Sequence, residues 1–280
     1  MLAASLAVTS VLIVTGCSST ASTATSASPS AAGLPAALQG DLVNPVYIYP
    51  PYGFVGDDGK LTGLYPEVSD QLGTELGVSI TNKEEAFENT LTGVQSGKYI
   101  WLTGGEITAE RLQAFDWSLV NTTFATFLAL QKSPDLGKDE AGLCGFTIAA
   151  VSGSTQATAL ATISDSCTAK GLKPISVGQY KDFTALVLAL QSGQADLAAG
   201  DYVSEKDVIA KDATLKMTGP QITRNLVGIA TKKGSGLAQT VSDAINAMIA
   251  DGTYAKLFTK YGIQDLMIEK STVNPQPSGS

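Results

Sequence analysis

The sequence TGGEITAER, residues 103–111, follows a short run of strand-forming residues, SGKYIWL at 96–102, and leads into RLQAFDWS. This pattern predicts a strand, a tight Gly-Gly loop and the start of a helix. Thr108 is placed to cap that helix, because its hydroxyl can accept a backbone N–H of the first turn. Arg111 carries a guanidinium that can pair with a carboxylate through two parallel hydrogen bonds. The stretch predicts a site for a small carboxylate, or else a surface arginine at a helix start.

The composition excludes several classes of function. The chain has 280 residues, of which 44% are hydrophobic, so it can bury a large core, and its length suits two lobes better than one. A net charge of -8 argues against nucleic acid as a partner, because phosphates require a basic face. The absence of histidine removes Ser-His-Asp and Cys-His catalysis and the commonest metal sites. We therefore expect no metal and no cofactor.

Strands and helices alternate on the N-terminal side of this stretch. The expected elements are a strand running into a Pro-Pro bend at 46–54, a hairpin turn at 56–63, a helix at 65–76, a strand at 78–81 and a helix at 85–95. Such alternation predicts a mostly parallel sheet, in which ligands lie beyond the carboxyl ends of the strands. The Pro-Pro bend, Phe87 and the Gly-Gly loop all fall at that edge.

The C-terminal half repeats a sequence pattern of the N-terminal half. Gln-Ser-Gly precedes a strand that ends at a polar loop twice, at residues 95–97 and again at 191–193. The further expected elements are strands at 121–132, 143–149, 175–177 and 226–231, a helix at 181–191 and two helices within 236–261. The two halves are therefore predicted to face each other across a cleft.

The stretch at 103–111 resembles the ligand loop of the polar amino-acid solute-binding proteins of ABC importers, extracellular solute-binding protein family 3. That loop reads roughly Ser-Gly-Met-Thr-Ile-Thr-x-Glu-Arg, and the matching residues here are Thr103, Gly104, Ile107, Thr108, Glu110 and Arg111. ADGTYAKLFTKYG at 250–262 resembles the C-terminal helix of the family. The resemblance covers about residues 46–263. It implies an α/β, type II periplasmic-binding-protein fold, with two lobes joined by a two-strand hinge and the ligand cleft between them.

The resemblance also implies how the ligand is held. Arg111 would grip the α-carboxylate, with Thr155 contacting it from the opposite lobe and Asp201 receiving the α-ammonium. Thr155 could also cap its helix while binding the ligand. The alternative for Asp201 is a plain helix N-cap, and Tyr49 could equally be a core or edge aromatic rather than a stacking platform. The expected ligand-binding residues are Tyr49, Tyr52, Phe87, Thr103, Gly104, Glu106, Arg111, Thr155 and Asp201.

Glu106 departs from the family pattern, which has Ser or Thr at this position. A carboxylate beside Arg111 competes with the ligand carboxylate and repels it, most strongly in a dry site. We therefore expect preference for a cationic or donor-rich amino-acid-like solute over glutamate or aspartate.

The N-terminus has the features of an export signal. Residues 2–14 form an apolar run too short to span a bilayer, which is typical of the central region of a signal peptide. VTGC at 14–17 resembles a bacterial lipobox, which implies that Cys17 carries lipid; the alternative is an ordinary secretory peptide with an incidental cysteine. No Lys or Arg precedes the run, so we expect the true start upstream.

Two further cysteines remain, Cys144 and Cys167, an even number in a chain that leaves the cytoplasm. The start of a strand and the end of the following helix can be neighbours in a β-α unit. A structural disulfide is therefore predicted.

The expected organisation has six parts. They are a lipoprotein signal peptide at 1–17, a disordered tether rich in Ser, Ala, Thr and Pro at 18–41, lobe 1 at 42–124, lobe 2 at 125–231, the C-terminal part of lobe 1 at 232–268, and a polar tail at 269–280. The chain is expected to be a monomeric, lipid-anchored, extracytoplasmic protein that captures an amino acid or analogue by hinge closure and delivers it to an ABC permease.

Two other interpretations remain open. Relatives of this fold act as dehydratases, and Glu106 is the candidate general acid of such a cleft enzyme if burial raises its pKa. A sensor ectodomain is the third interpretation.

Overall fold

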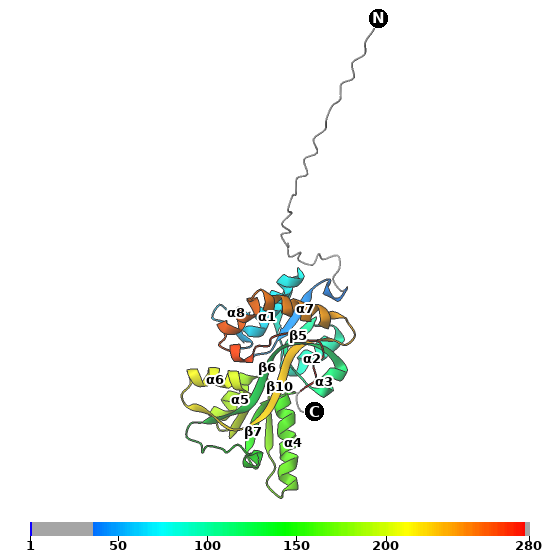
Figure 1. Ribbon diagram of the computed structural model, residues 1–280. Coiled ribbons are helices and arrows are strands. Elements are labelled where there is room, and N and C mark those ends of the chain that lie inside the picture. The colour runs from blue at the N-terminus through cyan, green and yellow to red at the C-terminus, as the bar shows by residue number, and fades with distance from the viewer. Residues whose placement is uncertain (2–35, 278–280) are drawn as a thin grey trace.

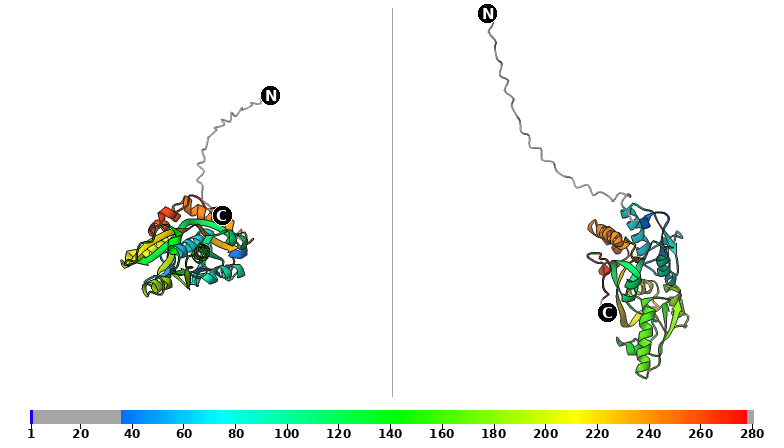
Figure 2. Two further views of the ribbon diagram at one scale, coloured as in Figure 1. Left: turned by 90° about the horizontal axis from the view of Figure 1, so that it is seen from below. Right: turned by 90° about the vertical axis from the view of Figure 1, so that its right-hand side faces the viewer.

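A computed structural model describes Met1 and residues 36–277 of the chain (Figure 1). In the ribbon, the first elements of this range and the helices within residues 237–260 lie together in the upper half, and the middle of the chain forms the lower half. The side view in Figure 2 shows the same division into two parts. The chain thus leaves one lobe, builds the other and returns, which agrees with the predicted two-lobed α/β fold.

The first lobe begins with a strand and a tight turn. Its elements are β1 (Leu42–Val46), the hairpin of β2 (Phe54–Val55) and β3 (Leu61–Thr62), α1 (Leu64–Leu76), β4 (Ile80–Glu84), α2 (Phe87–Ser96), β5 (Trp101–Ile107) and α3 (Ala109–Ala114). β1 and β4 pair in parallel. Helix α1 buries Leu64, Val68, Leu72 and Leu76 at four-residue spacing and ends at Gly77, whose φ of 68° is the left-handed conformation that glycine adopts readily.

The strand predicted at 46–54 is wrong in its bounds. The strand β1 ends at Val46, and a turn follows in which the backbone carbonyl of Tyr49 accepts from the amides of Tyr52 (2.8 Å) and Gly53 (3.1 Å). Pro50 and Pro51 have no N–H to offer a sheet, so the chain cannot continue as a paired strand. This turn carries two tyrosines toward the space between the lobes.

Two long antiparallel strands connect the lobes. They are β6 (Phe115–Leu130) and β10 (Leu215–Lys232), and their pairing extends from Lys232 opposite Phe115 to Leu215 opposite Leu130. The register shifts between Thr218 and Thr223 and again between Val227 and Gly228. Figure 1 shows both strands running from one lobe into the other. The expected two-strand hinge is therefore a pair of continuous strands.

The main sheet is mixed in direction. Its order is β5-β10-β6-β9-β7-β8, and only the pairs β7–β8 and β7–β9 within it are parallel. The parallel arrangement predicted for the N-terminal strands holds for β1 and β4, whereas β5 joins the main sheet antiparallel to the crossover strand β10.

The second lobe packs helices on the other end of this sheet. Its remaining elements are the 3-10 turn η3 (Glu140–Leu143), β7 (Thr147–Val151), α4 (Thr155–Ala169), β8 (Ser176–Tyr180), α5 (Phe183–Gln191), β9 (Leu197–Asp201) and α6 (Tyr202–Lys211). The predicted disulfide is present: Cys144 before β7 is bonded to Cys167 near the end of α4, with their Cα atoms 5.7 Å apart. It ties the helix to the strand that leads into it.

The C-terminal helices lie on the first lobe. They are α7 (Leu237–Ala250), α8 (Thr253–Lys260) and the short 3-10 helix η4 (Gln264–Leu266). Tyr254 donates through its hydroxyl to the Val120 carbonyl (2.7 Å), and Lys260 contacts both carboxylate oxygens of Glu67 on α1 at 2.7 and 2.8 Å. These contacts place α8 against both α1 and β6.

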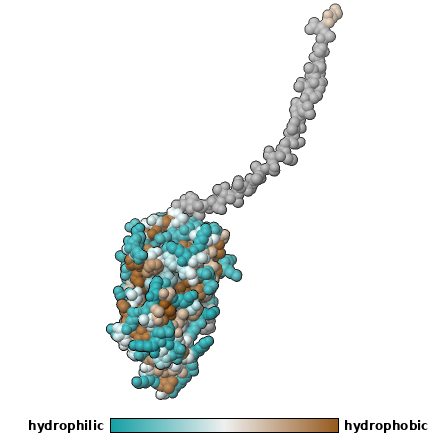
Figure 3. Space-filling model, turned by 90° about the vertical axis from the view of Figure 1, so that its left-hand side faces the viewer, coloured by the Kyte–Doolittle hydropathy of each residue, from teal (hydrophilic) through white to brown (hydrophobic). Residues whose placement is uncertain are grey.

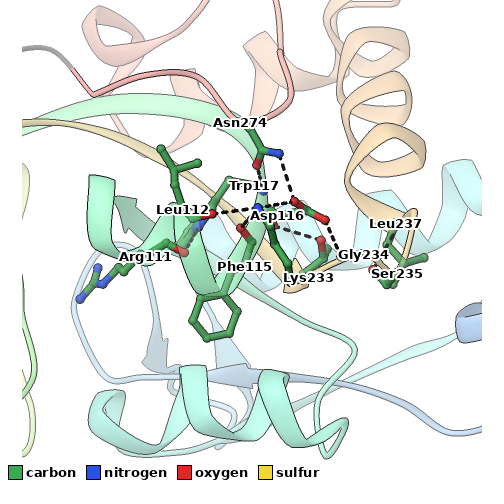
Figure 4. Close-up of polar contacts among 11 residues, drawn as sticks. Arg111, Leu112, Phe115, Asp116, Trp117, Lys233, Gly234, Ser235, Leu237 and Asn274 are labelled. Carbon is green, nitrogen blue, oxygen red and sulfur yellow. Dashed lines mark hydrogen bonds and ion pairs between the residues drawn. The ribbon is translucent and has the colours of Figure 1, made fainter.

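The segment expected as a polar tail runs along β6. Leu119 and Thr272 share a backbone hydrogen bond of 3.0 Å, and the Asn274 amide donates to the Trp117 carbonyl at 2.8 Å. Figure 4 shows the side chain of Asn274 over Asp116, to which it donates (3.1 Å), while its oxygen accepts the Trp117 N–H (2.8 Å). The tail therefore takes the place beside β6 that β9 occupies in the other lobe.

Asp116 also holds the start of the return segment. It contacts Lys233 Nζ at 3.0 Å and accepts the Gly234 N–H at 2.7 Å (Figure 4). Desolvation favours its neutral form, yet the contacts from Gly234, Asn274 and Lys233 hold the pKa of Asp116 below its ordinary value. The charged carboxylate thus joins three separate segments of the chain.

The exposed surface of the folded part is mixed. The face in Figure 3 is mostly hydrophilic, with hydrophobic residues in small groups. No helix among residues 36–277 is long and apolar enough to span a bilayer. The predicted signal peptide, Cys17 and nearly all of the tether lie outside the described residues.

Candidate ligand cavity

A cavity of about 50 Å³ lies between the two lobes, at the hinge strands. It is lined by Tyr47, Tyr49, Tyr52, Tyr65, Phe87, Gly104 and Glu106 from the first lobe, Thr123 and Val227 from the hinge strands, and Val151, Ser154, Gln156 and Asp201 from the second. One water needs roughly 10–15 Å³ of such space, so the cavity holds about four water-sized groups. Both lobes supply polar atoms to it, which is the closed arrangement of a two-lobed protein.

Aromatic rings form one wall of the cavity. Tyr52 stacks on Tyr65 with ring centroids 4.7 Å apart and planes 6° from parallel. Tyr47 meets the Phe87 ring edge to face at 5.0 Å, and Tyr49 packs on Phe183 of the opposite lobe at 4.6 Å. Each ring packs on another ring, and the contact between Tyr49 and Phe183 joins the two lobes.

Gly104 lets these rings approach the backbone. Gly105 pairs with Gly228 and Thr103 with Ile229, so Gly104 is the extra residue of a β-bulge, with φ of 92°. A Cβ here would lie 2.1 Å from the Tyr65 ring. The predicted Gly-Gly loop is therefore wrong: both glycines lie within β5, and the bulge turns the strand toward the cavity.

Asp201 is both a helix cap and a cavity wall. At the end of β9, its Oδ1 accepts from the Val203 amide (2.9 Å) and from the Tyr52 hydroxyl of the other lobe (2.8 Å). Its own backbone N–H donates to the Tyr49 hydroxyl at 2.9 Å. Asp201 thus fastens the Pro-Pro turn of the first lobe to the second.

Burial sets the protonation of Asp201. Desolvation raises the pKa of Asp201 to about 7, and the charge of Glu106 adds to the rise, although the hydrogen bonds from Tyr52 and Val203 oppose it. Behind it lies Glu205, whose side chain is fully buried and accepts only the Gly200 N–H at 3.2 Å among residues 36–277. Burial, and then Asp201, raise the pKa of Glu205 well above its ordinary value.

Glu106 faces the cavity from β5. Its Oε1 accepts from Gln156 Nε2 at 3.3 Å across the cleft. Burial raises the pKa of Glu106, while the charge of Arg111 and hydrogen bonds from Asn225 and Gln156 oppose that rise. Two carboxyl groups, Glu106 and Asp201, therefore face one small cavity.

Arg111 lies at the margin of the cavity rather than in its lining. Its NH1 donates to the Glu106 carbonyl at 2.9 Å, and its NH2 reaches across the cleft to the Gly153 carbonyl at 3.0 Å. The guanidinium carbon is 5.6 Å from the Phe87 ring centre. As predicted, the Thr108 hydroxyl caps α3 by accepting the Arg111 amide at 3.1 Å.

Two further expected residues, Thr155 and Thr103, do not line the cavity. Thr155 is the first residue of α4, and within the described part of the chain its hydroxyl makes only long contacts of 3.5 Å, with Gln156 and Asn225. Thr103 is buried and donates to Asn44 Oδ1 at 3.1 Å, which ties β5 to β1. The structure thus brings together Tyr49, Tyr52, Phe87, Gly104, Glu106 and Asp201.

Several residues that line the cavity were not predicted from the sequence. The additional ones are Tyr47, Tyr65, Thr123, Val151, Ser154, Gln156 and Val227. Tyr47 was detectable, because alternate residues of an extended segment share a face and Tyr49 was already a candidate. Tyr65 follows the bend as a helix residue, so no local pattern marks it as a cavity wall.

Comparisons with known proteins place the chain among solute-binding proteins. Residues 46–264 match the family described as bacterial extracellular solute-binding proteins, family 3. The L-cystine-binding protein TcyJ of Escherichia coli (strain K12) is 30% identical over 216 residues, covering 76% of this chain and 79% of that protein. The arginine-binding protein ArgT of Corynebacterium glutamicum is 26% identical over 238 residues, or 82% and 76% of the two chains.

A solved structure of similar sequence has the same fold. An ancestral arginine-binding protein bound to arginine superposes with a TM-score of 0.70 at 26% identity, over 80% of this chain and 99% of that one.

Proposed function

The chain belongs to the bacterial extracellular solute-binding proteins of family 3, and on that basis we propose that it captures an amino acid or amino-acid-like small molecule for an ABC importer. The observation that carries the proposal is the cavity between the lobes, which takes polar groups from both. Such a cavity exists only when the lobes are together, so its occupant links binding to closure.

Hinge closure is the proposed mechanism. The lobes already meet through Tyr52 and Asp201 (2.8 Å), Glu106 and Gln156 (3.3 Å), and Arg111 and Gly153 (3.0 Å). A ligand that adds contacts to both walls binds the closed form more tightly than the open one and shifts the population toward it. The permease can then distinguish loaded from empty protein by shape.

Asp201 is the group proposed to receive the ammonium of the ligand, with the aromatic wall packing on its body. Arg111 and Thr155 flank the cavity and are the groups that a ligand carboxylate would have to reach. The Arg111 guanidinium already donates to the Glu106 and Gly153 carbonyls, so a ligand carboxylate would use its remaining N–H donors or displace a carbonyl.

A thermal-shift screen of amino acids and related zwitterions tests the proposal. A ligand that binds only the folded protein stabilises it by RT ln(1 + [L]/Kd), about 3 kcal/mol at one hundred times Kd. We expect a concentration-dependent rise in Tm for at least one member. A panel without any shift contradicts capture of such solutes.

Membrane attachment through Cys17 is proposed for the same protein, which would act as a monomer outside the cell. The support is the VTGC sequence at 14–17 after an apolar run. Cys17→Ala should release the protein to the medium, while Ser18→Ala as a control should leave it at the membrane. Retention of the Cys17→Ala variant at the membrane would contradict lipid anchoring through Cys17.

The second candidate function is catalysis in the cleft. We propose instead that the protein is not an enzyme. The observation that favours catalysis is Glu106, whose pKa is raised by burial in the cavity, as a general acid requires. The named relatives, by contrast, are binding proteins. Turnover of prephenate-like acids by the purified protein, lost in Glu106→Gln, would overturn the proposal.

A further inference from the structure

The groups that could receive a ligand carboxylate are already partly engaged by the protein itself. Arg111 gives NH1 to the Glu106 carbonyl (2.9 Å) and NH2 to the Gly153 carbonyl (3.0 Å). Both terminal nitrogens of its guanidinium are therefore engaged, each by a backbone atom and one from each lobe. Two of the five N–H donors of Arg111 are thus taken by backbone carbonyls, and a ligand carboxylate would have to share the guanidinium with them.

The second possible carboxylate site is the N-terminus of α4, where the helix dipole favours an anion. The Glu106 carboxylate contacts the first turn of this helix, because its Oε1 accepts from the side-chain Nε2 of Gln156, the second residue, at 3.3 Å. Ser154 Oγ caps the helix by accepting the Ala157 amide at 3.2 Å. A ligand carboxylate at this helix start would therefore lie close to the carboxylate of Glu106.

The rest of the cavity lining is suited to a cation rather than to an anion. None of its lining residues is Lys or Arg, whereas Glu106 and Asp201 both belong to the lining. Five of the lining side chains are aromatic, from Tyr47, Tyr49, Tyr52, Tyr65 and Phe87. Aromatic faces attract cations, and this attraction grows when the cation is removed from water.

The hydroxyl of Thr123 is a further polar group of the lining. Thr123 lines the cavity, its side chain is 4% exposed, and its hydroxyl oxygen has no hydrogen-bond partner among residues 36–277. A buried hydroxyl without a partner is unfavourable unless something supplies one. An ammonium group carries donors that this oxygen can accept.

We propose that the cavity takes a small organic cation without a carboxylate, a protonated amine or guanidine, in preference to the corresponding α-amino acid. The inference rests on the proposed solute-capture function and names its substrate class. The cation would lie between Glu106 and Asp201 against the aromatic rings, with Thr123 accepting from it. A ligand carboxylate would instead lie beside Glu106 in a site shielded from water, where like charges repel strongly.

The size of the cavity is consistent with this class. Its volume of about 50 Å³ admits roughly four water-sized groups, which is enough for an ammonium or guanidinium head with its first carbons. The rest of a longer amine would require the lobes to part slightly.

Matched pairs of amine and amino acid test the proposal. Calorimetric titration of the purified protein would use agmatine against arginine, cadaverine against lysine and histamine against histidine. The members of each pair differ only in the α-carboxylate. We expect the tightest ligand to be an amine, bound at least about tenfold more tightly than its amino acid.

Glu106→Gln is the diagnostic variant, because it removes the charge and nearly keeps the shape. This variant should weaken amine binding at least about tenfold. It should also reduce the difference in affinity between the amine and the amino acid of each pair. Glu110→Gln, the same change at an exposed position on α3, is the matched control and should leave all affinities unchanged. Thermal unfolding of both variants checks that they fold alike.

The outcomes separate this inference from the proposed function. If an amino acid is the tightest ligand and its amine binds weakly, the inference is overturned while solute capture stands. If no amine and no amino acid binds, both are overturned. Equal loss of amine binding in Glu106→Gln and Glu110→Gln would also refute the role of Glu106.

Discussion

Asp201 makes the capture of an ammonium group dependent on pH. Burial raises the pKa of Asp201 to about 7, so the carboxyl is largely neutral at pH 5.5 and charged at pH 8.5. The groups that face it are Tyr49, Tyr52, Glu106 and Glu205, and all of them lack positive charge. A ligand ammonium is the missing counter-charge, and it pairs only with the ionised carboxylate.

The magnitude follows from proton competition. With a pKa of about 7, protonation reduces apparent affinity by a factor of about 30 at pH 5.5 and negligibly at pH 8.5. That factor corresponds to about 2 kcal/mol. The ligand must keep its positive charge over the whole range, which a guanidinium or quaternary ammonium does.

The same pKa gives a prediction for the empty protein. Because the folded pKa of Asp201 lies above its unfolded value of 3.8, the protein loses stability as pH rises from about 4 to about 7. The loss from this group is about 4 kcal/mol at most, at 1.36 kcal/mol for each unit. Glu205 changes stability in the same direction.

Calorimetry at pH 5.5, 7.0 and 8.5 checks the binding prediction with the tightest ligand found. Asp201→Asn should bind weakly at all three values, because an amide at this position keeps the Oδ1 acceptor for Tyr52 and Val203 but carries no charge. Asp165→Asn, at an exposed position on α4, should retain the full rise. A flat profile in the unmodified protein, or an undiminished rise in Asp201→Asn, refutes the reasoning.

Three further changes probe the rest of the structure. Replacing Cys144 and Cys167 by serine should lower the free energy of unfolding by about 3 kcal/mol, since their 23-residue separation closes a sizeable loop; an unchanged urea midpoint would count against this. Gly104→Ala should cost about 1–3 kcal/mol and weaken ligand binding, because the new methyl overlaps an aromatic ring, whereas Gly137→Ala has open space and should be neutral by thermal unfolding. Asn274→Ala should lose about 1–2 kcal/mol with its two side-chain hydrogen bonds to β6, and equal urea curves would show that the tail contributes nothing.

The fold was largely predictable because its signals are local. Apolar spacing and a final glycine marked α1, and the repeated Gln-Ser-Gly before a strand marked the two lobes. The cap at Thr108 and the disulfide between Cys144 and Cys167 were also legible, since each depends on residue type and near neighbours.

The geometry of the cavity was less predictable because it depends on distant partners. The bulge at Gly104 exists through its pairing with β10, more than a hundred residues later. The direction of the Arg111 guanidinium is set by the Gly153 carbonyl of the other lobe. Likewise, nothing near Asn274 in the sequence indicates that Asp116 and Trp117 will bind it.

Capture by closure of two lobes is the central claim, and small-angle X-ray scattering during titration with the tightest ligand tests it most directly. The ligand-free protein should have the larger radius of gyration, which should fall to a constant value as the cavity fills. An unchanged radius at a ligand concentration where calorimetry shows full binding would contradict closure as the mechanism.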